Sequence, residues 1–131
     1  MSIKYFVTIT NYAQSYYIKR FKKQHESAWP ITEKAIIVQY ERLDNFLETS
    51  KAKVILKSGN IKIIKSEFSV AGTKISPKKS GNKCIAAIDI NKKTVKILLV
   101  YCKGDVSNSQ NETFWWRKKI IDNYLEYKSL F

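Results

Sequence analysis

Two β-like runs joined by a short polar turn place the strongest constraint on how this chain folds. The runs are Cys84–Ile90 and Thr94–Cys102, and three polar residues (91–93) separate them, which is typical of a β-hairpin. The second run is apolar on both faces, the pattern of a central strand covered on both sides. Simple alternation puts one set of side chains on one face (Val95, Ile97, Leu99, Tyr101) and a second set on the other (Leu98, Val100, Cys102).

The N-terminal part of the chain predicts one strand and two helices. Alternating apolar side chains indicate a strand at Ile3–Ile9. Thr10 or Asn11 then caps a first helix with aromatic residues at helical spacing. We expect the Trp29-Pro30 step to break this helix or the loop after it, and a second helix to span about residues 32–49. The two helices predict an αα-hairpin that packs on the sheet.

A second β-hairpin is predicted on the N-terminal side of the hairpin at residues 84–102. Residues 53–56 and 60–65 are β-like and flank the turn signal Ser58-Gly59-Asn60. Residues 72–81 (GTKISPKKSG) have the glycine, proline and hydroxyl content of a loop.

The C-terminal part predicts a polar connector and one more helix. The connector is residues 106–110, and Asn111 or Thr113 caps the helix.

The element order predicts a single α+β domain over residues 1–131. It contains an N-terminal strand, an αα-hairpin packed on an antiparallel sheet of about four to five strands, and a C-terminal helix.

Positive charge is concentrated in the middle of the chain. The segment Lys51–Gly104 holds thirteen lysines, no arginine and only two acidic residues, Glu67 and Asp89. The whole chain carries a formal net charge of +13. This balance points to a polyanionic partner, nucleic acid first and an anionic membrane surface second. A lysine-rich proteome is an alternative explanation of the composition, but it does not explain the uneven placement of the acidic residues.

Several classes of function have no support in the sequence. No apolar run is long enough to cross a membrane and no signal peptide is visible, so we expect a cytoplasmic protein without a membrane partner. Cys84 and Cys102 are expected to be reduced, small hydrophobic residues. With the lone His25, expected at a surface or capping position, they make no metal site. Nucleotide-binding, serine-hydrolase and zinc-protease motifs are absent, and no cofactor is expected.

The remaining chemistry, lysine and tyrosine on a sheet, suits phosphodiester substrates. Fixed cations stabilise the charge that develops on phosphate during cleavage, often the largest catalytic effect. RNA supplies its own nucleophile, because the 2′-OH attacks the adjacent phosphate once a base removes its proton. A lysine crowded by other lysines can serve as that base.

The element order and two short motifs resemble the RelE/ParE superfamily of type II toxins. In that family a glycine, a variable residue and a basic residue start the third strand, and Gly81-Asn82-Lys83 fits. The last strand ends in a run such as L-x-V-x-x-K/R, and residues 98–103 (LLVYCK) fit. The resemblance implies a RelE-like mRNA interferase toxin. Such a protein is a ribosome-dependent endoribonuclease that cuts mRNA in the decoding site, inhibits translation, arrests growth and is held inactive by a cognate acidic antitoxin.

The resemblance also implies roles for individual residues. Lys83 takes the place of a phosphate-contacting arginine, and Lys103 takes the basic place at the scissile phosphate. Other lysines lie near those that provide the general base in RelE-type members, and Tyr101 is the nearest tyrosine for a general acid. Glu67 is a weaker candidate, as a carboxylate base. The predicted catalytic residues are Lys83, Lys103, Lys78, Lys79 and Tyr101, and the predicted RNA-binding residues are Lys65, Lys74, Lys78, Lys79, Lys83 and Lys103.

Departures from the family pattern keep other hypotheses open. Lysine stands where family members often have arginine, and lysine cannot grip phosphate in a bidentate way. No histidine stands near the last strand to act as an acid. ParE-like members share the fold, lack the nuclease residues and inhibit DNA gyrase. The alternative is therefore a non-catalytic RNA- or DNA-binding or gyrase-inhibiting protein, and a third hypothesis is an inert basic domain with a hydrophobic interaction surface.

Overall fold

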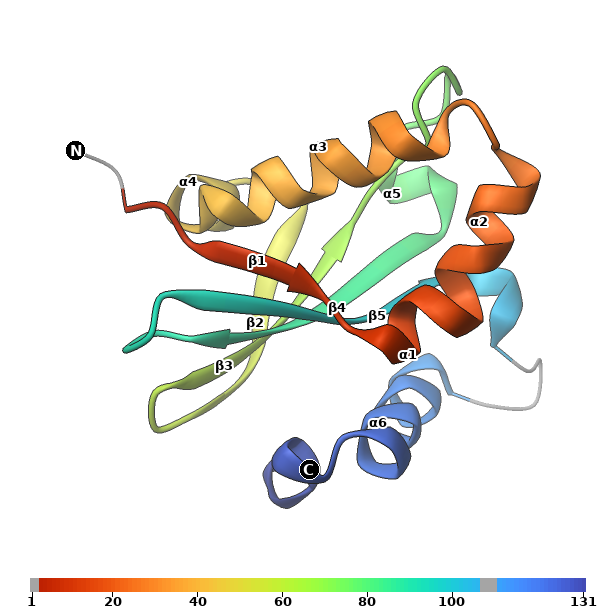
Figure 1. The fold of residues 1–131 in the computed structure, drawn as a ribbon. Coiled ribbons are helices and arrows are strands. Elements are labelled where there is room, and N and C mark those ends of the chain that lie inside the picture. Colours follow the sequence, from red (N-terminus) through yellow and green to blue (C-terminus); the bar gives the residue numbers. More distant parts are fainter. Residues whose placement is uncertain (1–2, 107–110) are drawn as a thin grey trace.

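A five-stranded sheet with helices on both faces makes up the computed structural model, which describes residues 3–106 and 111–131 (Figure 1). Most of the predicted connector at residues 106–110 lies outside the described residues. The strands are β1 (Phe6–Ile9), β2 (Ala52–Ser58), β3 (Ile61–Glu67), β4 (Asn82–Asp89) and β5 (Thr94–Cys102). The helices are α1 (Asn11–Ala13), the π-helical η1 (Gln14–Ile18), α2 (Lys19–Gln24), α3 (Trp29–Glu41), α4 (Leu43–Leu47), α5 (Pro77–Ser80), the 3-10 turn η2 (Lys103–Asp105), α6 (Glu112–Asn123) and the 3-10 turn η3 (Leu125–Leu130).

The strand order is β1-β5-β4-β3-β2, which makes β5 an interior strand as its two apolar faces predict. The strands β2, β3, β4 and β5 pair antiparallel, and both predicted hairpins form. β1 joins β5 in parallel, with Val7 opposite Val95. The predicted α+β fold is confirmed, and its sheet is mixed rather than antiparallel throughout. Side-chain alternation indicates which face of a strand is buried, but it carries no information about the direction of the neighbouring strand.

The helical region differs from the prediction at its boundaries. Thr10 is the cap of the first helix, and its Oγ1 accepts a hydrogen bond from the Ala13 N–H at 3.2 Å. Pro30 lies in the first turn of α3 rather than in a break, because a proline lacks only an N–H that this turn leaves unpaired. The predicted single helix over 32–49 is wrong, since the chain leaves helical geometry at Arg42 (φ −106°, ψ 51°) between α3 and α4.

The sheet separates two hydrophobic cores. Helices α1 to α4 cover one face, where Tyr40 and Ile97 are buried. Helix α6 and the C-terminal turn η3 cover the other, where Trp115 and Trp116 pack against the sheet (Figure 1). A bulge in β5 leaves Leu98 without a partner in the register. The predicted faces are therefore wrong beyond this point: Leu99 packs on the α6 face with Tyr101, and Ile97 on the opposite face with Val100.

Candidate functional site

The loop between β3 and β4 is tied to the body of the protein at several points. The Ala71 N–H donates to Oγ1 of the buried Thr32 at 2.8 Å. Near the end of the loop, Ser80 Oγ donates to the Phe68 carbonyl at 2.7 Å and accepts from the Asn82 N–H at 3.0 Å. The loop predicted from the sequence also contains the helical turn α5, which Ser76 caps through a hydrogen bond from the Lys79 N–H. These contacts position the side chains of α5 beside the sheet.

A cavity of about 430 Å³ lies between this loop and the strands β2, β3 and β4. We call it the basic cavity, because five of the residues that line it are lysines. Its polar wall includes one carboxylate, that of Glu67. Its lining residues are Ser50, Lys51, Ala52, Lys53, Lys65, Glu67, Ser76, Pro77, Lys78 and Lys83. The register explains part of this gathering: Lys53 lies opposite Lys65, and Glu67 opposite Lys83, on neighbouring strands.

Lys83 and Glu67 form an ion pair in the wall of the basic cavity. The Lys83 Nζ lies 2.9 Å from Glu67 Oε2, and the two side chains are only 16% and 21% exposed. The pair places a cation and a proton acceptor side by side at the surface of the cavity. An anionic phosphate would attract the ammonium, and the carboxylate beside it has the chemistry of a general base.

A second network lies beside this pair and joins the sheet to α6. Lys65 Nζ and the Tyr101 hydroxyl both donate to Glu112 Oε2 at 2.8 Å. Burial raises the pKa of Glu112, but the hydrogen bonds from Lys65 and Tyr101 and the charges of Lys65 and Lys83 outweigh burial, so its pKa lies below the ordinary value of 4.5. Glu112 is therefore a carboxylate at neutral pH.

Tyr101 lies in the core rather than in the basic cavity. Its residue surface is 0% exposed, and its hydroxyl proton is engaged by Glu112. Burial, with the Glu112 hydrogen bond, raises the pKa of Tyr101 far above its ordinary range. In this arrangement Tyr101 helps to hold Glu112, and the predicted role as a general acid requires that this contact be broken.

The other predicted lysines divide into two groups. Lys65, Lys78 and Lys83 line the basic cavity together. Lys74, Lys79 and Lys103 are exposed and do not line it. Lys103 follows β5, and its N–H donates to the Gly81 carbonyl at 2.8 Å. The structure thus brings together half of the lysines proposed for RNA contact.

The sequence prediction missed three members of this region. Lys51 and Lys53 line the basic cavity, and their signal was present in the lysine count of the segment. Glu112 was noted only as a residue near a helix N-terminus. Its contact with Lys65 spans 47 positions of sequence, and no local pattern indicates such a pairing.

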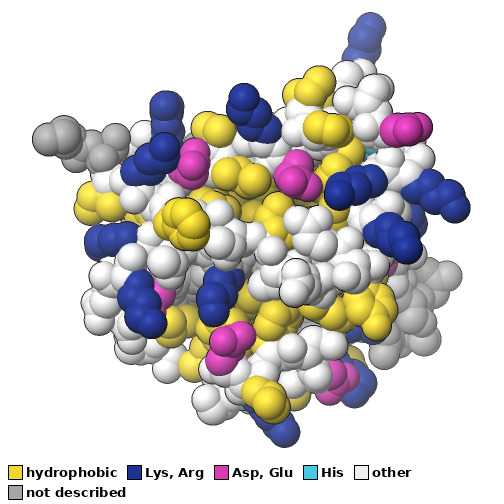
Figure 2. All heavy atoms as spheres, in the orientation of Figure 1, with side chains coloured by type: hydrophobic (Ala, Val, Ile, Leu, Met, Phe, Trp, Pro, Cys, Tyr) yellow, Lys and Arg dark blue, Asp and Glu magenta, His cyan; other side chains and the backbone are white. Residues whose placement is uncertain are grey.

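Positive charge is not confined to the basic cavity. On the face seen in Figure 2, Lys and Arg side chains are spread over the whole view and outnumber the acidic ones. Such a distribution attracts a polyanion from many directions and raises its rate of encounter. It does not select one site for it. The basic cavity is distinguished by its concave shape and by the carboxylate among its lysines.

The described residues offer little support for a metal site or a reactive thiol. No group of three His, Cys, Asp or Glu residues within them could hold a metal ion. Cys84 and Cys102 are both free, and Cys84 is buried whereas Cys102 is half-buried. Burial raises the pKa of the Cys84 thiol to about 12, so it stays protonated at neutral pH. None of the helices described is long and apolar enough to span a bilayer.

Comparison with known proteins gives one structural similarity to report. The chain is similar to a chain in the crystal structure of the archaeal RelE-RelB complex from Pyrococcus horikoshii OT3. The match covers 79% of this chain and 99% of that chain, with 14% sequence identity and a TM-score of 0.43. No protein-family model matches the chain, and no curated protein matches it. Its function therefore has to be inferred from the basic cavity itself.

Proposed function

We propose that the chain is the toxin of a type II toxin–antitoxin system and cleaves mRNA in the ribosomal decoding site, with the basic cavity holding the scissile phosphate. The observation that carries this proposal is the cavity itself: five lysines surround a single carboxylate in a concave wall. The motifs at residues 81–83 and 98–103 support the same family. A cognate acidic antitoxin would be complementary to the net charge of +13.

The chemistry of the cavity favours a carboxylate as the general base. Lys83 is held in an ion pair, and as an ammonium it is suited to contact phosphate. Glu67, beside it, takes the proton from the 2′-OH. The 2′ oxygen then bonds to phosphorus, the bond from phosphorus to the 5′ oxygen breaks, and the products are a 2′,3′-cyclic phosphate and a 5′-hydroxyl. Lys78, which has no ion-pair partner among the described residues, protonates the departing 5′ oxygen.

The test is cleavage of mRNA bound to purified ribosomes by protein freed of any antitoxin. Glu67→Gln keeps the size of the side chain and removes its basicity, so we expect cleavage to fall about 100- to 10,000-fold while RNA binding is retained. Lys83→Ala should weaken binding as well as cleavage. Lys92→Ala, at the exposed turn between β4 and β5, removes the same charge outside the cavity and should change neither.

A non-catalytic nucleic-acid-binding protein is the second candidate, and one observation favours it. The tyrosine predicted as the acid is buried, and the described lining of the basic cavity contains no histidine, arginine or tyrosine. If wild-type protein binds RNA or DNA but leaves ribosome-bound mRNA intact, this candidate replaces the nuclease. In that case Lys83→Ala should reduce the salt dependence of binding by a slope of about 1.

A further inference from the structure

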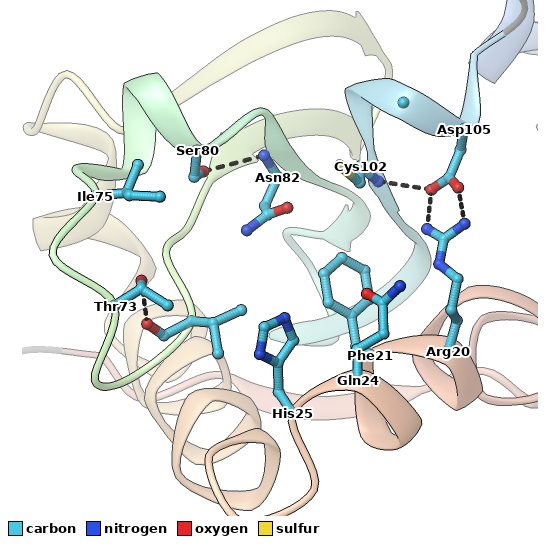
Figure 3. Close-up of a pocket in the computed structure, with 12 residues that line it drawn as sticks. Arg20, Phe21, Gln24, His25, Thr73, Ile75, Ser80, Asn82, Cys102 and Asp105 are labelled. Atoms are coloured by element: carbon cyan, nitrogen blue, oxygen red, sulfur yellow. Dashed lines mark hydrogen bonds and ion pairs between the residues drawn. The ribbon is translucent and has the colours of Figure 1, made fainter.

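A second cavity, of about 400 Å³, lies on the opposite face of the sheet, between α2, the β3–β4 loop and the end of β5 (Figure 3). We call it the amide pocket, because the carboxamides of Gln24 and Asn82 line it. Its apolar wall includes Phe21, Val70 and Ile75. The volume lies within the range of small-ligand pockets. Nothing in the proposed nuclease chemistry uses this pocket.

Asn82 contributes the most buried polar side chain of the pocket wall that is free of an ion pair. It is only 8% exposed, and its backbone N–H is satisfied by Ser80 Oγ. Its side-chain amide has no hydrogen-bond partner among the described residues and points into the pocket, toward His25 and Gln24 (Figure 3). The amide faces the open pocket, where a ligand can hydrogen-bond to it.

The other polar groups of the pocket define the chemistry of the ligand. The Arg20 guanidinium and the Asp105 carboxylate form a bidentate ion pair with each other, which leaves no unpaired charge in this part of the wall (Figure 3). Gln24, His25 and Asn82 offer neutral or weakly basic donors and acceptors. Such a wall suits an uncharged, flat group with its own donors and acceptors, and it does not suit a phosphate.

We infer that the amide pocket binds an adenine base of single-stranded RNA. Asparagine and glutamine carboxamides are the side chains that pair in a bidentate way with the N6 and N7 edge of adenine. The inference extends the proposed function, since RNA held by the basic cavity supplies the base. Asn82 and Lys83 are neighbours in β4 and face opposite cavities. The same loop provides Ser80 to one cavity and Lys78 to the other, so a strand passing over the end of β4 can place a phosphate in one and a base in the other.

The experiment is calorimetric titration of the full chain with adenosine and with cytidine, neither of which carries a phosphate. We expect adenosine to bind the wild type, cytidine to bind at least tenfold more weakly, and salt to have little effect. Asn82→Ala should weaken adenosine binding about tenfold or more. Asn91→Ala, the same substitution at an exposed turn, should leave it unchanged. Gln24→Ala, at an exposed position, provides a second weakened variant should Asn82→Ala unfold.

Three outcomes would overturn the inference. The first is no adenosine binding by folded wild-type protein. The second is binding that neither Asn82→Ala nor Gln24→Ala weakens. The third is equal binding of cytidine, which removes the assignment to adenine. Lys83→Ala should retain nucleoside binding, so a failure of the nuclease proposal at the basic cavity is distinguishable from a failure at the amide pocket.

Discussion

Two carboxylates stand out at the scale of single residues, and their surroundings differ. Glu67 lines the basic cavity beside Lys83, with its side chain partly exposed. Glu112 lies behind it, accepting from Lys65 and Tyr101. The second carboxylate thereby orients Lys65, one of the lysines of the cavity wall. Positioning of this kind determines how well a cation meets a developing charge.

Glu112 should make the stability of the protein sensitive to acid. Its pKa in the folded state lies below the ordinary value of 4.5. Its contribution to the free energy of unfolding is therefore fully present above pH 4.5 and is lost as the pH falls through the folded-state pKa. Glu112→Gln should lower stability at neutral pH and flatten its decline below pH 4.5, as measured by urea unfolding across that range.

Glu48→Gln is the matched control for this measurement. Glu48 is exposed and has no ion pair among the described residues. Glu48→Gln should leave the decline of the free energy of unfolding below pH 4.5 unchanged. A decline of the same steepness in Glu112→Gln and in the wild type would contradict the proposed network.

At the scale of elements, one bulge in β5 decides how α6 is attached. The register skips Leu98, so its carbonyl is available to a group outside the ladder. The Tyr124 hydroxyl, at the end of α6, donates to that carbonyl and lies 2.6 Å from Thr10 Oγ1. The bulge thus joins the C-terminal helix, the interior strand and the cap of the first helix through one hydroxyl. At the other end of α6, Glu112 contacts Lys65, which lines the basic cavity.

Tyr124→Phe tests this attachment. The substitution keeps the ring and leaves the buried Leu98 carbonyl without its partner, so we expect the free energy of unfolding to fall by about 1–3 kcal/mol. Urea unfolding at neutral pH measures the change. Tyr16→Phe removes the same hydroxyl from a side chain that is 66% exposed and should change stability little. Equal effects of the two substitutions would show that the Leu98 contact contributes nothing.

At the scale of the whole molecule, buried tyrosines in both cores should make the stability of the protein depend on alkaline pH. Burial is the largest cause that raises the pKa of Tyr124 and of Tyr127 to about 12, and it raises that of Tyr40 well above its ordinary value. Tyr40 belongs to α3 and is buried in the core on one face of the sheet. Tyr124 lies at the end of α6, Tyr127 lies in η3, and both are buried in the core on the other face. Burial therefore disfavours the phenolate form on both faces of the sheet.

Alkaline pH should destabilise both cores of the protein together. A phenol whose folded-state pKa is raised contributes stability that is fully present below the unfolded value of 10 and is lost as the pH rises through the folded value. We expect the urea midpoint to fall between about pH 10 and 12. The ultraviolet absorbance of phenolate from the buried tyrosines should rise together with the loss of helical circular dichroism. Smooth ionisation of all eight tyrosines before any loss of structure would contradict this prediction.

The sequence by itself determined several of the elements, because the patterns that produce them are local. The apolar run in β5, the turn at Gly59 and the cap at Thr10 each act over a few residues, and all three lie where they were predicted. The density of lysine between residues 51 and 104 likewise indicated an anionic partner. The assignment of Lys103 and Tyr101 to a common site with Lys83 was made by position along the chain, and position does not specify which side chains share a cavity.

Only the tertiary structure decided which of these lysines lie together and what they face. The basic cavity joins residues from 50 to 83, and its neighbouring network reaches Glu112 on α6. The Leu98 bulge changed the faces of β5, and the strand alternation placed Asn82 and Lys83 on opposite sides of the sheet. Ion pairs and cavities depend on distances between segments far apart in sequence. Those distances arise only when the sheet pairs and the helices pack on it.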